Sequence, residues 1–174
     1  MTWLRHSSRM LHATVASYIE TQLTALGWTT PGSTPFGAPV LTYISTWPQE
    51  WQTIAQLQPG TFAITIGDEQ DSTPEELGGV LVVQEIPIFC DMFMDNEGTA
   101  LALACDVRDI VKGRLSGTVM TLALKDFTAS TPTDVPGWSI ELGDVVREVP
   151  LSTAPQWQVV KVTASCYFNE VRGD

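Results

Sequence analysis

WQVVKVTASCYFNEV, from Trp157 to Val171, is the stretch around which the fold is organised. Its alternate residues are apolar and polar residues lie between them, which is the two-residue period of a strand with one buried face. At about 3.3 Å per residue it would span about 40 to 50 Å, longer than an average strand. We therefore expect it to cross a whole sheet. The apolar set is Val160, Val162, Ala164, Cys166 and Phe168.

Other strands are predicted upstream of this one. The strongest is Val80 to Phe93, a natural partner for the last strand. Pro87 interrupts it and cannot donate a ladder hydrogen bond, so an edge, a bulge or a break is expected there. The remaining expectations are strands at 40–44, 61–67 and 118–126, a strand pair at 138–149 with its turn at 142–144, and a turn-rich connection at 128–137.

Two amphipathic helices are predicted from apolar residues at helical spacing. The first runs from Ser8 to Leu26 and ends at Gly27; the second runs from about Glu97 to Leu115, with Asp95 or Asn96 as its cap. A brief third helix is expected from Thr46, because proline is tolerated in a first helical turn. The order of elements indicates an α+β fold, with one mixed, mainly antiparallel sheet and the two main helices packed on one face.

Length and charge limit the classes of function. The chain has 174 residues, which predicts a single domain, 1–174, large enough for its own core. With 20 acidic and 9 basic residues the net charge is −11, which repels phosphate backbones and anionic membranes. No apolar run is long enough to span a bilayer and no signal peptide is recognisable, so a cytoplasmic protein without a membrane partner is expected. Cys90, Cys105 and Cys166 are expected to be reduced and buried in the core.

The segment from Gly67 to Gly79, GDEQDSTPEELGG, carries five carboxylates and no basic residue. Like charges keep a segment solvated, so a flexible surface loop is expected, and it is our candidate for a segment that becomes ordered on assembly. The spacing does not match a calcium-binding loop. The carboxylates are Asp68, Glu69, Asp71, Glu75 and Glu76.

No stretch carries a catalytic signature. Nucleotide-binding glycine motifs, zinc-binding histidine pairs and nucleophile motifs are missing from the sequence. The only histidines, His6 and His12, precede every cysteine by many residues and lack the spacing of a metal site. We therefore expect a protein that is not an enzyme, with no cofactor, no metal and no catalytic residue.

Six tryptophans are many for this length, and several lie at the ends of predicted elements. Tryptophan is enriched in protein interfaces, although at such positions it also covers the edge of a core. Together with the long strand and the acidic segment, they suggest a subunit of a closed ring. The candidate interface residues are Trp3, Trp47, Trp51, Trp138 and Trp157.

The ordered layout resembles the phage tail terminators, the family of the lambda-type minor tail protein U. It is carried by LHATVASYIETQLTALGW near the start, the W-x-x-I-A-x-L-x-P-G-x-F-A-I-T pattern from Trp51 to Thr65, the strand GVLVVQEIPIFCDMF, the helix ALACDVRDIVKGRL and the last strand. The acidic segment and the 128–136 connection have no counterpart in that layout.

The resemblance implies a virion protein, assembled in the host cytoplasm, that forms a hexameric ring with itself. Such a ring would cap the tail tube protein and join a head–neck connector or stopper protein, with DNA only in transit through the lumen. A head-completion or stopper subunit is the nearest alternative. A small cytoplasmic enzyme or ligand-binding domain is the alternative of another class.

Overall fold

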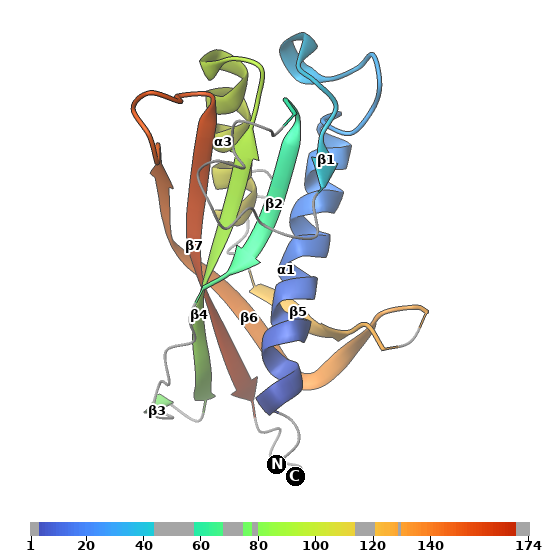
Figure 1. Cartoon of the computed structure of the whole chain (residues 1–174). Helices are drawn as coiled ribbons and strands as arrows, with labels where there is room; N and C mark the ends of the chain where they lie inside the picture. The colour runs from blue at the N-terminus through green and yellow to red at the C-terminus, as the bar shows by residue number, and fades with distance from the viewer. Residues whose placement is uncertain are drawn as a thin grey trace.

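Two long antiparallel strands, β4 (Val80–Phe93) and β7 (Trp157–Asn169), form the centre of the sheet (Figure 1). The computed structural model describes residues 4–43, 58–67, 75–77, 80–113, 121–128 and 130–169. The two strands pair from Val80 opposite Asn169 to Phe93 opposite Trp157, with one bulge between Val82 and Gln84. The long last strand predicted from its alternation is therefore confirmed.

The remaining strands extend this pair on both sides. The order across the sheet is β1-β2-β4-β7-β6-β5, and β3 pairs with β4 beyond the end of β2. All neighbours are antiparallel except β1 and β2, which are parallel, so the predicted mixed and mainly antiparallel sheet is confirmed. The bounds are β1 Thr42–Tyr43, β2 Thr61–Ile66, β3 Glu75–Leu77, β5 Thr121–Asp126 and β6 Thr133–Glu148.

The two predicted main helices are present, α1 (Leu4–Ala25) and α3 (Glu97–Val111), although α1 begins before the expected Ser8 and α3 ends at Val111, with Lys112 as its C-cap, before the expected Leu115. Asn96 caps α3, since its side-chain oxygen accepts a hydrogen bond of 3.0 Å from the Thr99 N–H. After α1 the chain turns at Gly27, whose φ of +88° is a left-handed conformation that suits glycine. A short 3-10 turn, η1 (Pro35–Gly37), lies in the connection that leads from α1 to β1.

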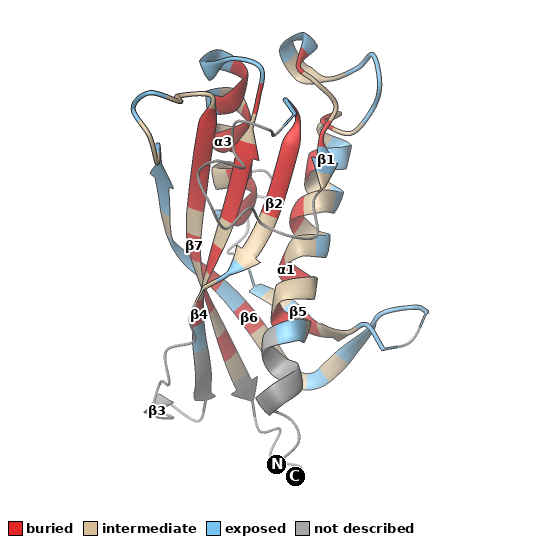
Figure 2. Cartoon of the chain, in the orientation of Figure 1, coloured by how far each residue is buried: buried red, intermediate tan, exposed pale blue. Residues whose placement is uncertain are grey.

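One face of the sheet packs against both helices, so the α+β fold with its helices on one face is confirmed. Val160, Val162 and Ala164 of β7 point to this side and are buried together with the apolar stripes of α1 and α3. Figure 2 shows this buried layer running along β2, β4 and β7 toward α1. The other face, which we call the outer face, carries the alternate residues of the same strands, including Lys161, Thr163 and Ser165 of β7.

The predicted strand pair at 138–149 is wrong, because β6 is one continuous strand of 16 residues. It begins at Thr133, inside the segment expected to be a connection, and pairs with β7 from Trp138 to Glu148. The residues interpreted as a turn instead form a bulge between Gly143 and Val146. Pairing along the whole of a long neighbour outweighs a local turn preference, and the left-handed residue Asp144 is accommodated as extra length in the strand.

Pro87 neither breaks β4 nor causes its bulge. It lies one residue beyond the last β4 partner of β2, and its carbonyl oxygen accepts a 2.8 Å hydrogen bond from the Gly67 N–H. The N–H and C=O of a residue point to the same side of a strand, so the proline nitrogen faces the end of β2, where its missing donor breaks no ladder bond. Of the three alternatives, the edge position is the one observed.

Two further expectations change. Glu75 and Glu76 belong to β3, which pairs antiparallel with the start of β4, so this part of the predicted loop is a strand. The pairing runs up to Leu77 opposite Val80. The strand expected at 40–44 is reduced to two residues, and the short helix expected from Thr46 lies outside the described residues.

Candidate assembly surface along strand β6

Helix α1 contacts backbone groups of strands near both ends of the sheet. The His12 ring contacts the Ile64 carbonyl of β2 through Nε2 at 2.7 Å, and the Thr14 hydroxyl oxygen accepts a 3.0 Å hydrogen bond from the Lys125 N–H of β5. β5 is the last strand of the sheet order, and β2 is the second from the other end, beside the two-residue strand β1, so the sheet curls around α1 until both reach it. Side chains thus satisfy backbone groups that an edge strand would leave free to pair with another chain.

Within the described residues, which do not include 114–120 just before β5, residues 142–148 of β6 have no such cover. Pairing of β6 with β5 ends at Glu141, although pairing with β7 continues to Glu148. Of the strands that the structure describes, none pairs with residues 142–148 on the side away from β7; we call this side the open edge. The bulge lies within it, and the side chain of Val146 is 48% exposed.

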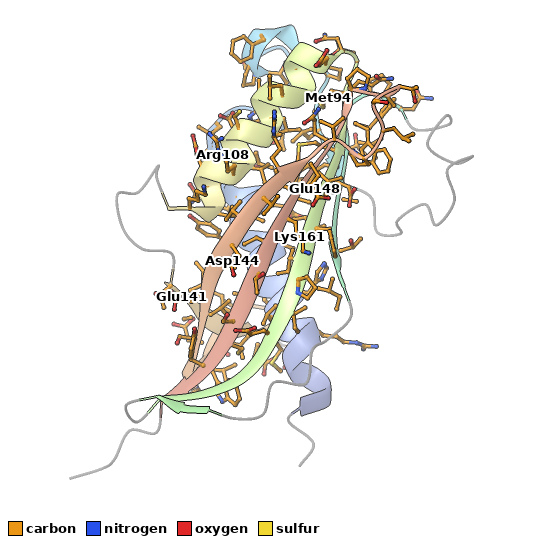
Figure 3. The ribbon with its side chains drawn as sticks, turned by 90° about the vertical axis from the view of Figure 1, so that its left-hand side faces the viewer. Met94, Arg108, Glu141, Asp144, Glu148 and Lys161 are labelled. Carbon is orange, nitrogen blue, oxygen red and sulfur yellow. The ribbon has the colours of Figure 1, made fainter. Side chains whose placement is uncertain are left out.

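Acidic side chains lie on the open edge and directly beside it, where Glu141 is the last residue of β6 paired with β5. Glu141, Asp144 and Glu148 are all exposed, and Figure 3 shows them along β6 on the side that faces the viewer. Glu141 and Glu148 stand opposite Ser165 and Val159 of β7, which places them on the outer face. Arg147 of β6 is also exposed, next to Glu148, so three carboxylates and one guanidinium leave this part of the strand with a net negative charge.

Two further basic residues, one on β7 and one on α3, have other contacts. Lys161 of β7 places its Nζ 5.7 Å from the centre of the Phe89 ring, a cation–π contact across the β4–β7 pair. Arg108 of α3 pairs with Asp109, its neighbour in the chain, at 3.3 Å. The acidic character of the surface is therefore reduced only in part by these two groups.

One carboxylate on the outer face is buried. Asp91 of β4 is 5% exposed and accepts a hydrogen bond of 3.3 Å from the indole N–H of Trp157. Burial raises the pKa of Asp91 to about 7, and the hydrogen bond from Trp157 lowers it in part. Trp157 itself is only 7% exposed, so its side chain is buried within the subunit and presents little surface for a partner.

The other predicted assembly residues are scattered. Trp138 is partly buried in β6 and packs against the core, and Glu75 and Glu76 lie in β3 at the far end of β4. The residues of this prediction that lie outside the described part of the chain are Trp3, Trp47, Trp51, Asp68, Glu69 and Asp71.

Sequence reasoning missed the β6 carboxylates. The predicted strand pair at 138–149 places Glu141 and Glu148 in two different strands of a hairpin, with Asp144 in the turn between them. The length of the segment could have indicated a single strand. Apolar and polar residues continue on both sides of Gly143, over about as many residues as in the last strand. Only the register with β7 shows that the three lie along one strand.

Within the described residues no group of three or more His, Cys, Asp or Glu side chains is placed to hold a metal ion. Cys90 and Cys166 are buried as predicted, and burial raises the pKa of the Cys166 thiol to about 11. Cys105 is only half-buried, on the side of α3 away from its apolar stripe. Among the helices in the described part of the chain, none has the length and apolar character needed to cross a membrane.

In the described part of the chain, these features define an α+β subunit in which α1 contacts backbone groups of β2 and β5, and the acidic end of β6 has no strand partner on the side away from β7. No family model matches the chain, and no curated protein matches it.

Proposed function

We propose that this protein is a structural subunit of a phage virion, a tail terminator. Copies would form a ring, expected to be a hexamer, that caps the tail tube protein and joins a head–neck connector or stopper protein. The supporting observation is that, among the described strands, the acidic end of β6 has no partner on the side away from β7, while α1 contacts backbone groups of β2 and β5. An edge left open in this way is suited to assembly, and the α+β architecture is the one that the resemblance implies.

The charge supports a ring through which DNA passes without being held. A surface that carries Glu141, Asp144 and Glu148 repels phosphate, as does the net charge of −11. A lumen lined in this way would let DNA move through it, since few basic groups are present to bind the backbone. We assign the lumen to the β6 surface, to the acidic segment 67–79, or to both.

The first test is the mass of the purified protein over a range of concentrations, by native mass spectrometry, followed by negative-stain imaging. We expect a sixfold ring with a central hole. If the protein is monomeric, the same chain is sought in purified virions, because a subunit of this kind can close into a ring on the tail tip alone. A monomer that is also missing from virions would contradict the proposal.

The lumen assignment is tested by neutralising each acidic surface separately. One variant carries Glu141→Gln, Asp144→Asn and Glu148→Gln; the other changes Asp68, Glu69, Asp71, Glu75 and Glu76 to their amides. We expect at least one of them to lower phage titre tenfold or more while the protein remains folded. Glu97→Gln, an exposed carboxylate on α3, is the control. An unchanged titre for both variants would remove the assignment.

A further inference from the structure

The connection from α1 to β1 presents an aromatic side chain to solvent. Phe36, in the 3-10 turn η1, is 83% exposed, more than any other large hydrophobic side chain of the described residues. Hydrogen bonds hold the turn: the Ala38 N–H donates to the Pro35 carbonyl at 3.0 Å, and the Thr34 hydroxyl donates to the Ala38 carbonyl. The phenyl group therefore projects from a hydrogen-bonded turn and takes no part in the core.

The backbone at Phe36 is also unfavourable for this residue type. Its φ of +57° is left-handed, and the next residue, Gly37, has a φ of +68°, which are the two positive angles of a type I′ turn. Asparagine, aspartate or glycine usually occupies the first of these positions, because a bulky side chain crowds the backbone there. Phe36 thus gains neither a relaxed backbone nor burial within the subunit. Residues strained in this way cluster at binding and switch sites.

A hollow of about 370 Å³ lies directly beside the phenyl group, which forms one of its walls. Figure 1 places the start of α3 and the turn at residues 35–37 at the same end of the molecule. The remaining walls come from the start of α3 and consist of Asn96, Gly98, Thr99 and Ala102. Gly98 and Ala102 are one helical turn apart and carry little or no side chain, which leaves room for the hollow. A projecting aromatic group and a recess that could receive one are therefore adjacent on a single surface.

The charge around this turn differs from that of the rest of the molecule. No charged residue occurs between Glu20 and Glu50, the longest uncharged stretch in a chain whose net charge is −11. Copies of so acidic a protein repel each other, so they approach at the lowest cost through an uncharged surface. Asp95 and Glu97, at the start of α3, are exposed and add some repulsion, although Asp95 already accepts a 2.6 Å hydrogen bond from the Thr99 hydroxyl.

We infer that Phe36 is the anchor of a contact between two copies of this chain, in which the phenyl group of each copy enters the hollow of the other. Because the phenyl group and the hollow are adjacent, insertion of one group brings the second group to the hollow of the first copy. The contact is therefore two-fold and self-complementary. The two phenyl groups lie next to each other in this arrangement, and aromatic pairs are stabilising. An aromatic side chain that fills a pocket commonly dominates the binding energy of an interface.

This contact is separate from the ring of the proposed function. It joins two single subunits or, where six copies have already closed, two rings face to face. A ring of six that never doubles would leave the tail-terminator proposal standing and overturn the two-fold contact. A dimer that forms no ring would do the reverse.

The test is the mass of the full chain over a range of concentrations, by native mass spectrometry and light scattering. We expect the mass to double as the concentration rises, from one copy to two or from one ring to two. Added salt should strengthen this association several-fold, because it screens the repulsion between acidic copies and leaves the apolar contact intact. A mass that never doubles, or a doubling that salt weakens, would overturn the inference.

Phe36→Asn separates the contact from the fold. It should weaken the association by about tenfold or more, because it removes the aromatic anchor. It should also raise the melting temperature of the separated subunit by about 2 to 8 °C, because asparagine tolerates the left-handed conformation. If Phe36→Asn lowers the melting temperature, or leaves the association unchanged, the inference is wrong.

Two further variants complete the experiment. Ala102→Gln places a longer side chain in the hollow without breaking α3, and it should weaken the association as Phe36→Asn does. Phe127→Asn makes the same substitution at another exposed phenylalanine, after β5, and should leave the association unchanged. If the parent never doubles but binds the tail tube protein, and Phe36→Asn does not bind it, the phenyl group serves a different partner and the contact between two copies is wrong.

Discussion

The strand edges on the α1 side of the sheet are covered by the helix, whereas the edge of β6 has no partner among the described strands. On the α1 side, His12 and Thr14 occupy backbone groups of β2 and β5, and the apolar stripe of the helix is fully buried. On the β6 side, the strand continues beyond its partner β5 and exposes Val146 and three carboxylates. An edge covered by the chain's own helix contributes to folding. An edge without a described strand partner contributes less to folding.

The largest effect expected from this difference is on stability. Ile19→Ala removes a fully buried side chain from α1 and should lower the free energy of unfolding by about 2 to 5 kcal/mol. Val146→Ala on the open edge should cost less than about 0.5 kcal/mol, because the side chain is already half exposed. Urea denaturation measures both. Similar losses for the two variants would mean that the β6 side is part of the folding core.

The next effect concerns the buried carboxyl of the outer face. The pKa of Asp91 is raised from 3.8 to about 7 in the folded protein, so folding takes up a proton between these values. The contribution of the protonated Asp91 carboxyl to the free energy of unfolding is therefore fully present below about pH 4 and is lost as the pH rises through about 7. Asp91→Asn, which keeps the acceptor for Trp157, should be more stable than the parent at pH 8, by on the order of 1 to 3 kcal/mol, and equal to it below pH 4.

The control for this experiment is Glu85→Gln, an exposed carboxylate on the same face of β4. It should change the free energy of unfolding little at either pH, since its charge is already solvated. Thermal unfolding from pH 4 to pH 8 makes the comparison. A gain for Asp91→Asn that is the same at every pH would show that the substitution acts through packing and not through the charge.

The smallest effect expected is at a single capped edge. Thr14→Val keeps the shape of the side chain and removes the acceptor for the Lys125 N–H, so it should cost about 1 to 2 kcal/mol. Amide hydrogen exchange at Lys125 should become faster. Thr14→Ser keeps the hydroxyl and should preserve the slow exchange. If exchange at Lys125 is equally slow in Thr14→Val, the helix covers this edge by exclusion of water alone.

Local patterns in the sequence predicted the main elements well. The alternation in β7, the helical spacing in α1 and α3 and the cap at Asn96 are properties of short segments, and each appears where expected. The errors occur where the conformation of a segment depends on a strand that is distant in the sequence. Gly143 and Asp144 favour a turn, but pairing with β7 turns them into a bulge. Pro87 is harmless only because β2 ends beside it.

The candidate sites were less predictable than the fold. Nothing in the sequence places Phe36 next to Gly98, or His12 next to Ile64, because these pairs join segments that are far apart in the chain. Burial of Trp157 was also not predictable, since its partner Asp91 lies 66 residues away in sequence. A tryptophan at the end of a strand is equally compatible with an interface and with a core.

The sequence by itself determined which segments form strands and helices, which face of each is apolar, and that the protein is strongly acidic. These properties follow from side chains a few residues apart, whose spacing has a direct geometric meaning. Only the tertiary structure decided which strand edges are covered, where the carboxylates gather and what lies beside Phe36. These depend on register and curl, which bring distant residues together and are fixed only when the whole sheet has closed around α1.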